Sequence, residues 1–154
     1  FDMNLPLGKV DAKNIEVQER TRTATRDYKK HALLAEDNKI NQKVTKLVLK
    51  KLGIDITLAE NGQDALDKWD PKTMDFIILD IQMPVMDGLE AVKQFRKNSC
   101  EVAIVAMTAN FFQEDVETYL SSGFDACIAK PLIVEEMVSI FDIILRKKHS
   151  DIFG

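Results

Sequence analysis

The stretch 75-DFIILDIQMPVMDG-88 decides how this chain folds, because an apolar run in it stops at an acidic residue and then breaks. Residues 76–79 are apolar at every position, which is typical of a strand that is buried on both faces. Pro84 and Gly88 then mark a loop and the start of the next element. Because burying a charge without a partner is costly, the carboxylate of Asp80 at the end of this strand calls for a functional reason.

The same short apolar pattern occurs four more times along the chain. The predicted strands are residues 31–36, 54–59, 76–80, 102–107 and 126–130. Between and after them apolar residues recur at helical spacing, in five sets: Ile40, Val44, Leu47, Val48 and Leu52; Ala65, Leu66 and Trp69; Leu89, Val92 and Phe95; Phe112, Val116, Tyr119 and Leu120; and Val134, Met137, Val138, Phe141, Ile144 and Leu145. Alternating strands and helices predict an α/β fold, with a parallel sheet covered by helices on both faces.

Composition excludes several classes of protein. The chain has 154 residues, 45% of them hydrophobic, and a net charge of −4, which suits a packed globular domain and argues against a nucleic-acid surface. No apolar stretch is long enough to span a membrane, so no membrane contact by this fragment is expected. Cys100 and Cys127 form neither a disulfide framework nor a zinc-binding pattern, which favours a reducing compartment and a cytoplasmic location.

Polar residues stand at the ends of four predicted strands. Glu36 and Asp37 follow the first, Asp80 ends the third, Thr108 follows the fourth and Lys130 ends the fifth. In an open parallel sheet the carboxyl ends of the strands meet at one edge, where ligands bind. Three carboxylates at that edge repel one another more than one ammonium can offset, so a hard divalent ion such as Mg²⁺ is expected. Such a site can hold a phosphoryl group, with Asp80 as the nucleophile.

This arrangement resembles the receiver domain of two-component signalling, over nearly all of residues 31–148. The motifs that carry the resemblance are AEDN (35–38), ILDIQMPVMDG (78–88), MTAN (107–110) and AKPL (129–132), in the order and at the spacings of the family. The resemblance implies a flavodoxin-like, doubly wound sheet of five parallel strands in the order 2-1-3-4-5, with five helices.

The resemblance also implies a role for each site residue. Asp80 would accept a phosphoryl group from the phosphohistidine of a histidine kinase, acting in cis or in trans. Thr108 and Lys130 would bind the acyl phosphate, and Lys130–Pro131 would be a cis peptide bond. The Mg²⁺ ligands would be Glu36, Asp37, Asp80 and the backbone carbonyl of Gln82. Whether the phosphoryl group then passes to a histidine phosphotransfer protein stays open. The module would catalyse only its own phosphorylation and dephosphorylation.

Three positions bear on switching and lifetime. Family members that couple the threonine to an aromatic ring usually carry Tyr or Phe three residues before the lysine, and here that residue is Cys127. If phosphorylation is reported through the elements around this position, something other than that ring must carry the report. We therefore expect either a muted conformational change or a receiver that serves mainly as an intermediate carrier of the phosphoryl group. Gln82 and Asn110 occupy positions that tune the rate of phosphoryl hydrolysis in the family.

The amino-terminal residues suggest a larger context. FDMNLPL (1–7) resembles the closing strand of the ATP-binding domain of sensor histidine kinases, and residues 9–30 are a charged stretch of linker composition. We expect residues 1–8 to end a preceding kinase domain, 9–30 to form a linker, 31–148 the receiver and 149–154 a tail. The parent protein would then be a hybrid histidine kinase, which can be membrane-anchored.

Two other functions compete with this interpretation. A degenerate receiver would use the same acidic edge as a docking surface without being phosphorylated. An Asp-nucleophile phosphatase of the haloacid dehalogenase type would need a second Asp two residues after Asp80, where this chain has Gln82. Asp87 and Gly88 are expected to begin a helix instead of contributing chemistry.

Overall fold

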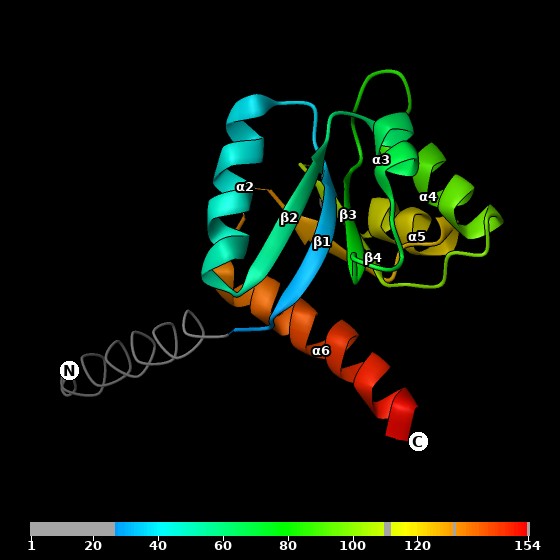
Figure 1. The fold of residues 1–154 in the computed structure, drawn as a ribbon. Helices are drawn as coiled ribbons and strands as arrows, with labels where there is room; N and C mark the ends of the chain where they lie inside the picture. Colours follow the sequence, from blue (N-terminus) through cyan, green and yellow to red (C-terminus); the bar gives the residue numbers. More distant parts are fainter. Residues whose placement is uncertain (1–26, 110–111, 131, 154) are drawn as a thin grey trace, which may run out of the picture.

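Five parallel strands and five helices alternate along the described part of the chain (Figure 1). The computed structural model describes residues 27–109, 112–130 and 132–153. The elements are β1 (Lys30–Ala35), α2 (Lys39–Lys51), β2 (Ile54–Ala59), α3 (Gly62–Lys68), β3 (Phe76–Asp80), α4 (Gly88–Lys97), β4 (Ile104–Thr108), α5 (Gln113–Ser122), β5 (Ala126–Ala129) and α6 (Val134–Phe153). The predicted preceding domain (1–8) and most of the predicted linker lie outside the described residues.

The strand order is β2-β1-β3-β4-β5, with every neighbouring pair parallel. This confirms the predicted doubly wound sheet. The chain leaves β1 toward β2 on one side and leaves β3 toward β4 on the other, so the connections after these two neighbouring strands diverge and a crevice opens at their carboxyl ends. The register pairs Ala35 with Leu79 and Asp80 with Met107, which aligns the ends of the central strands.

Helices cover both faces of the sheet and divide the core into two layers. In Figure 1, α2 and α6 lie on one face, while α3, α4 and α5 lie on the other. The first layer is built around the fully buried Phe76 and Phe141, whose rings meet edge to face with centroids 5.5 Å apart. The second contains Ile77, Leu79 and Phe95. β3 contributes to both layers, which explains why its sequence is apolar at every position.

The apolar residues found at helical spacing in α2 are divided between the core, where Leu52 and Val48 pack, and the surface. Ile40, Val44 and Leu47 are 73%, 50% and 64% exposed, whereas Gln42 and Thr45 are buried together with Leu49. The Gln42 side-chain amide donates a 2.6 Å hydrogen bond to the carbonyl of Glu36, so its nitrogen has a partner in the interior. The helix is therefore turned so that an apolar row faces outward.

β4 begins two residues later than predicted and ends one residue later, at Thr108. The Arg96 guanidinium donates hydrogen bonds to the carbonyls of Cys100 and Val102, each at 2.8 Å, so these carbonyls are bonded to a side chain before the strand begins. Arg96 also bonds Asp125 at 2.8 Å, and Asp125 accepts the backbone N–H of Ile104 at 2.9 Å. The regular pairing of β4 therefore starts at Ile104.

None of the helices in the described ranges combines the length and the apolar character that a membrane span requires.

Candidate functional site

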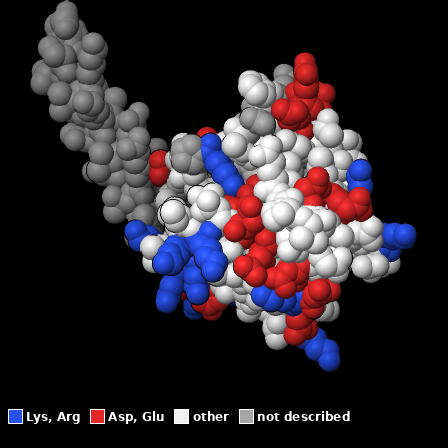
Figure 2. All heavy atoms as spheres, turned by 90° about the horizontal axis from the view of Figure 1, so that it is seen from above, with Lys and Arg blue, Asp and Glu red and all other residues white. Residues whose placement is uncertain are grey.

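A cleft of about 760 Å³ opens at the carboxyl edge of the sheet. Its walls come from the ends of β1, β3, β4 and β5 and from the loops that follow them. The lining residues include Glu36, Asp37, Asn38, Asn41, Asp80, Gln82, Asp87, Thr108 and Lys130. Figure 2 looks down on this edge, where acidic side chains gather at the centre beside a cluster of Lys and Arg over α2. All five residues predicted at the strand ends thus line one cleft.

Asp80 ends β3 at the floor of the cleft and is 6% exposed. Its Oδ1 accepts a hydrogen bond from the backbone N–H of Gln82 at 3.2 Å. The chain then turns back, and the N–H of Gly88 donates to the carbonyl of Ile81 at 3.0 Å. A Cβ at Gly88 would overlap the carbonyl oxygen of Asp80, so only glycine allows this close approach behind the carboxylate.

Lys130 lies between two buried carboxylates. Its Nζ is 2.7 Å from Asp80 Oδ2 and 2.8 Å from Glu36 Oε1, so one ammonium bridges the ends of β1 and β3 from the end of β5. Burial acts to lower the pKa of Lys130, but the hydrogen bonds and charges of Asp80 and Glu36 outweigh it and raise the pKa above its usual value. The side chain therefore stays cationic beside Asp80.

Glu36 and Asp37 complete an acidic group with Asp80. One carboxylate oxygen from each of the three lies within 4.8 Å of the others. Glu36 is 1% exposed, and its second oxygen accepts the N–H of Asn38 at 3.2 Å, whereas Asp37 is exposed at the mouth of the cleft. The buried carboxylates of Glu36 and Asp80 and the exposed carboxylate of Asp37 together offer hard oxygen donors that suit a divalent ion such as Mg²⁺.

Thr108 lies on β4 and Cys127 lies on the neighbouring strand β5. Thr108 is buried at 3% exposure, and its Oγ1 is 3.4 Å from the hydroxyl of Tyr119. Cys127 is buried at 7%, and burial raises the pKa of its thiol to about 11. Asn110 and the Lys130–Pro131 bond involve residues outside the described ranges, so their predicted roles remain predictions.

The loop after Asp80 is fixed by a hydrogen bond from the start of α3 and by the residue that caps α4. Val85 has a φ of 67°, a strained value for a β-branched residue, and it sits in a γ-turn in which Met86 donates to Pro84. The carbonyl of Met86 accepts the N–H of Gly62 at 2.8 Å. Asp87 caps α4 by accepting the N–H of Glu90 at 2.9 Å, which confirms its predicted structural role.

Two residues that the sequence analysis did not assign to the site contribute to it. Tyr119 was expected as a packing residue of its helix, but its hydroxyl reaches Thr108. Gln42 had no predicted role, but its amide fixes the backbone of Glu36. A tyrosine at helical spacing looks the same in the sequence whether or not its hydroxyl meets a site, so nothing in the pattern distinguishes it.

The arrangement favours transfer of an anionic electrophile to a carboxylate. Asp80 is a buried nucleophile with an ammonium at one oxygen and a hydroxyl-bearing residue on the adjacent strand. Cations and hydroxyl donors in this position neutralise negative oxygens as they approach. Phosphoryl groups carry such oxygens.

Comparisons with known proteins agree with this geometry. The family model described as "Response regulator receiver domain" matches residues 32–142. The two-component system protein A of Emericella nidulans is 37% identical over 115 residues, which cover 73% of this chain and 17% of that protein. The chain therefore spans less than a fifth of the length of that relative.

Two solved receiver domains are similar in structure as well as in sequence. One belongs to the Saccharomyces cerevisiae response regulator Ssk1 and was solved with the histidine phosphotransfer protein Ypd1; it is 33% identical with a TM-score of 0.66, and the match covers 74% of this chain and 87% of that one. The other belongs to a sensor histidine kinase of Pseudomonas aeruginosa, with a magnesium ion in its active-site cleft. It is 35% identical with a TM-score of 0.67, over 75% of this chain and 96% of that one.

Proposed function

Because the chain belongs to the response regulator receiver family, we propose that it accepts a phosphoryl group from a phosphohistidine on Asp80. The observation that carries this proposal is the position of Lys130, whose ammonium bridges Asp80 and Glu36 at 2.7 and 2.8 Å. A cation already in contact with the nucleophile is well placed to meet the oxygens of the incoming group.

In the proposed transfer, an oxygen of Asp80 forms a bond to phosphorus as the nitrogen–phosphorus bond of the donor breaks. The imidazole leaves with the electron pair of that bond and the phosphoryl group becomes an acyl phosphate. Lys130 would hold one phosphoryl oxygen, and the hydroxyl of Thr108 would donate to another. Because Asp80 is 6% exposed, the donor must approach through the mouth of the cleft.

The donor set also fits Mg²⁺. Glu36, Asp37 and Asp80 bring three carboxylate oxygens within 4.8 Å of one another, and Gln82 lines the same cleft. Hard oxygen ligands that leave room for water and phosphate oxygens are what this ion requires. When bound, Mg²⁺ would neutralise carboxylate and phosphoryl oxygens together. The solved Pseudomonas aeruginosa receiver with magnesium in its cleft supports this assignment.

The outer face of α2 supports a protein as the phosphodonor. The exposed apolar row is Ile40, Val44 and Leu47, and it begins close to Asn38 and Asn41 at the rim of the cleft. A second exposed row runs beside it, formed by Lys39, Lys43, Lys46 and Lys50. A partner with an apolar patch rimmed by acidic residues would match both rows. We propose that this partner is the histidine-bearing protein, in keeping with the Ssk1 receiver solved with Ypd1.

The larger context is proposed on the sequence and on the relatives. The solved receiver of a sensor histidine kinase shows that this fold occurs within such kinases, and FDMNLPL (1–7) fits the end of a kinase domain. We propose that the chain is the receiver portion of a hybrid histidine kinase that works in the cytoplasm.

The test is the intact mass of the protein after incubation with acetyl phosphate and Mg²⁺. We expect one added phosphoryl group in the wild type, none in Asp80→Asn and none when the metal is chelated. Asp87→Asn is the matched control: Asp87 lines the same cleft but caps α4, and asparagine caps a helix equally well. This variant should be phosphorylated like the wild type.

Two results would count against the proposal. Retained phosphorylation in Asp80→Asn would place the phosphoryl group on another residue. Absence of phosphorylation in the wild type, repeated with a phosphorylated histidine kinase as donor, would favour a receiver that uses its acidic cleft only for docking.

A further inference from the structure

The hydroxyl of Tyr119 contacts Thr108, a residue of the cleft. Tyr119 lies on α5, is 7% exposed, and its Oη is 3.4 Å from Oγ1 of Thr108. Its ring packs edge to face on Phe124, with centroids 6.4 Å apart and planes at 81°. The ring thus packs in the core while its hydroxyl contacts a residue of the cleft.

Tyr119 belongs to the same core cluster as Cys127, the position at which receivers with threonine–aromatic coupling usually carry Tyr or Phe. Cys127 on β5 is small, and the cluster also contains Phe124. β5 pairs with β4 so that Cys127 is opposite Ala106 and Ala129 is opposite Thr108. In this chain the buried aromatic near Thr108 therefore comes from α5 and carries a hydroxyl.

We propose that Tyr119 reports the phosphorylation state of Asp80 to α5 by losing its contact with Thr108 when Thr108 turns to the phosphoryl group. The inference rests on the proposed function, because it needs an acyl phosphate at Asp80. Tyr119 is a positioning residue in this scheme. It touches Thr108 and has no contact with the reacting atoms.

The distance explains why the contact can be exchanged. An ordinary bond between two hydroxyl groups has an oxygen–oxygen distance of roughly 2.7–2.8 Å, so the 3.4 Å contact is a weak one. A hydrogen bond to a charged phosphoryl oxygen is about twice as strong as one between neutral groups. The phosphoryl group therefore competes successfully for the Thr108 hydroxyl, and the Tyr119 hydroxyl must find another partner.

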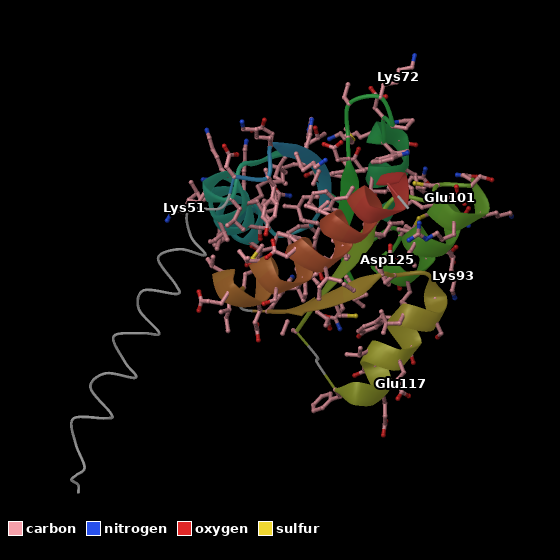
Figure 3. All side chains as sticks on the ribbon, turned by 90° about the horizontal axis from the view of Figure 1, so that it is seen from below. Lys51, Lys72, Lys93, Glu101, Glu117 and Asp125 are labelled. Carbon is pink, nitrogen blue, oxygen red and sulfur yellow. The ribbon has the colours of Figure 1, made fainter. Side chains whose placement is uncertain are left out.

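α5 is suited to pass the change to a partner. On its outer side Phe112 and Leu120 are 68% and 45% exposed, and Glu117 points into solvent (Figure 3). A shift of the Tyr119 ring would move this surface, because ring and surface belong to one short helix. The helix thus couples the buried hydroxyl to an exposed apolar surface.

The chain offers a built-in control for the experiment, since it has two tyrosines. Tyr28 lies on the opposite face of the sheet, where its ring packs on Phe141 with centroids 6.0 Å apart and its hydroxyl bonds Asp142 at 2.7 Å. Incorporation of 3-fluorotyrosine gives two fluorine resonances, which Tyr119→Phe assigns. Spectra are recorded with Mg²⁺ before and after acetyl phosphate, and the extent of phosphorylation is measured by mass on the same sample.

We expect the Tyr119 resonance to shift on phosphorylation while that of Tyr28 stays in place. The shift should persist in Thr108→Ser, which keeps the hydroxyl, and disappear in Thr108→Ala compared at equal phosphorylation. A merely structural role of Tyr119 would not depend on the Thr108 hydroxyl. An unmoved Tyr119 resonance in phosphorylated wild type, or an equal shift in Thr108→Ala, would overturn the inference.

A binding measurement tests the same exchange from the other side. Tyr119→Phe keeps the ring and removes the competing hydroxyl, so it should bind beryllofluoride, a phosphoryl mimic, about 2- to 5-fold more tightly than the wild type in the presence of Mg²⁺. Glu117→Gln, an exposed change on the same helix, should leave the affinity unchanged. Equal affinity in Tyr119→Phe and wild type would contradict the exchange.

The two proposals fail in different ways. A wild type that takes up neither a phosphoryl group nor beryllofluoride would remove the proposed function and this inference together. A wild type that is phosphorylated on Asp80 with a stationary Tyr119 would remove this inference alone.

Discussion

The ion pairs of the cleft join residues from different strands. Lys130 at the end of β5 pairs with both Glu36 after β1 and Asp80 on β3, so charged groups from three separate segments meet at one point. The sequence predicted these residues because a polar side chain at the end of a buried strand is conspicuous. Their hydrogen bonds could not be predicted, since they depend on the register that brings the strand ends level.

Cys127 gives a prediction at the scale of one residue. Burial raises the pKa of its thiol from an ordinary value near 9 to about 11, so the folded protein keeps this proton at pH values where the unfolded chain loses it. The stability that this thiol contributes is therefore complete below about pH 9 and lost between pH 9 and pH 11. Over this window the wild type should lose more unfolding free energy than Cys127→Ala, measured by urea unfolding.

Alkylation of the two thiols tests the burial of Cys127 on which this prediction depends, with Cys100 as the accessible reference. Cys100 is partly exposed, so a small alkylating reagent at pH 8 should modify Cys100 in the folded protein and reach Cys127 only after unfolding. Equal modification of both thiols in the folded state would show that Cys127 is not protected as the structure has it.

α2 shows where reasoning from the sequence fails at the scale of an element. Apolar periodicity correctly predicted a helix, but the apolar set that it identified includes Ile40, Val44 and Leu47, which are exposed. The actual buried face includes Gln42 because its amide has a partner in the Glu36 carbonyl. Periodicity scores residue type alone, so it cannot recognise a polar residue that is satisfied inside or an apolar row that is kept outside for a partner.

The exposed row of α2 leads to a prediction about phosphotransfer. Val44→Asp puts a charge into the proposed docking patch, and we expect it to slow phosphorylation by a phosphohistidine protein by about tenfold or more, since a hot-spot change at an interface costs more than roughly 1–2 kcal/mol. Phosphorylation by acetyl phosphate should be unchanged, because this small donor needs no docking surface. Rates of transfer from the two donors measure the difference.

Ile143→Asp is the matched control for Val44→Asp. Ile143 is an apolar residue of α6 with 65% exposure, so the substitution likewise replaces an exposed aliphatic side chain with a carboxylate, but on another helix. If both variants slow transfer from the protein donor equally, the patch on α2 is not the docking surface.

At the scale of the molecule, a two-layer core supports a charged edge. β3 supplies apolar side chains to both layers and ends in Asp80, so the strand that holds the core together also places the acidic residue. The alternation of strands and helices predicted a parallel sheet covered on both faces, and the family resemblance implied the strand order; the structure confirms both. The exact start of β4 was not predicted, because the Arg96 and Asp125 contacts that set it join residues far apart in the chain.

The acidic edge predicts that Mg²⁺ stabilises the whole fold. A ligand that binds only the folded state at ten times its dissociation constant adds about 1.4 kcal/mol to the free energy of unfolding. For a domain of this size that corresponds to a rise in Tm of roughly 3–6 °C. Asp37→Asn should remove most of this rise, because Asp37 supplies one of the three clustered carboxylates.

Glu60→Gln is the control for the magnesium effect. Glu60 is an exposed acid just after β2, at the same edge of the sheet but outside the acidic cluster. It should keep the full Mg²⁺-dependent rise in Tm. An equal rise in Asp37→Asn and the wild type would show that the ion binds elsewhere.

The central claim is that Asp80 carries the phosphoryl group, and the most direct test is to identify the modified residue chemically. Borohydride reduces an aspartyl phosphate to homoserine, so phosphorylated protein is reduced, digested and sequenced by mass spectrometry. We predict homoserine at position 80 only in samples treated with both a phosphodonor and Mg²⁺, with residues 36, 37 and 87 unchanged. Homoserine at one of those positions, or an unmodified residue 80 in a sample whose intact mass shows one added phosphoryl group, would contradict the account.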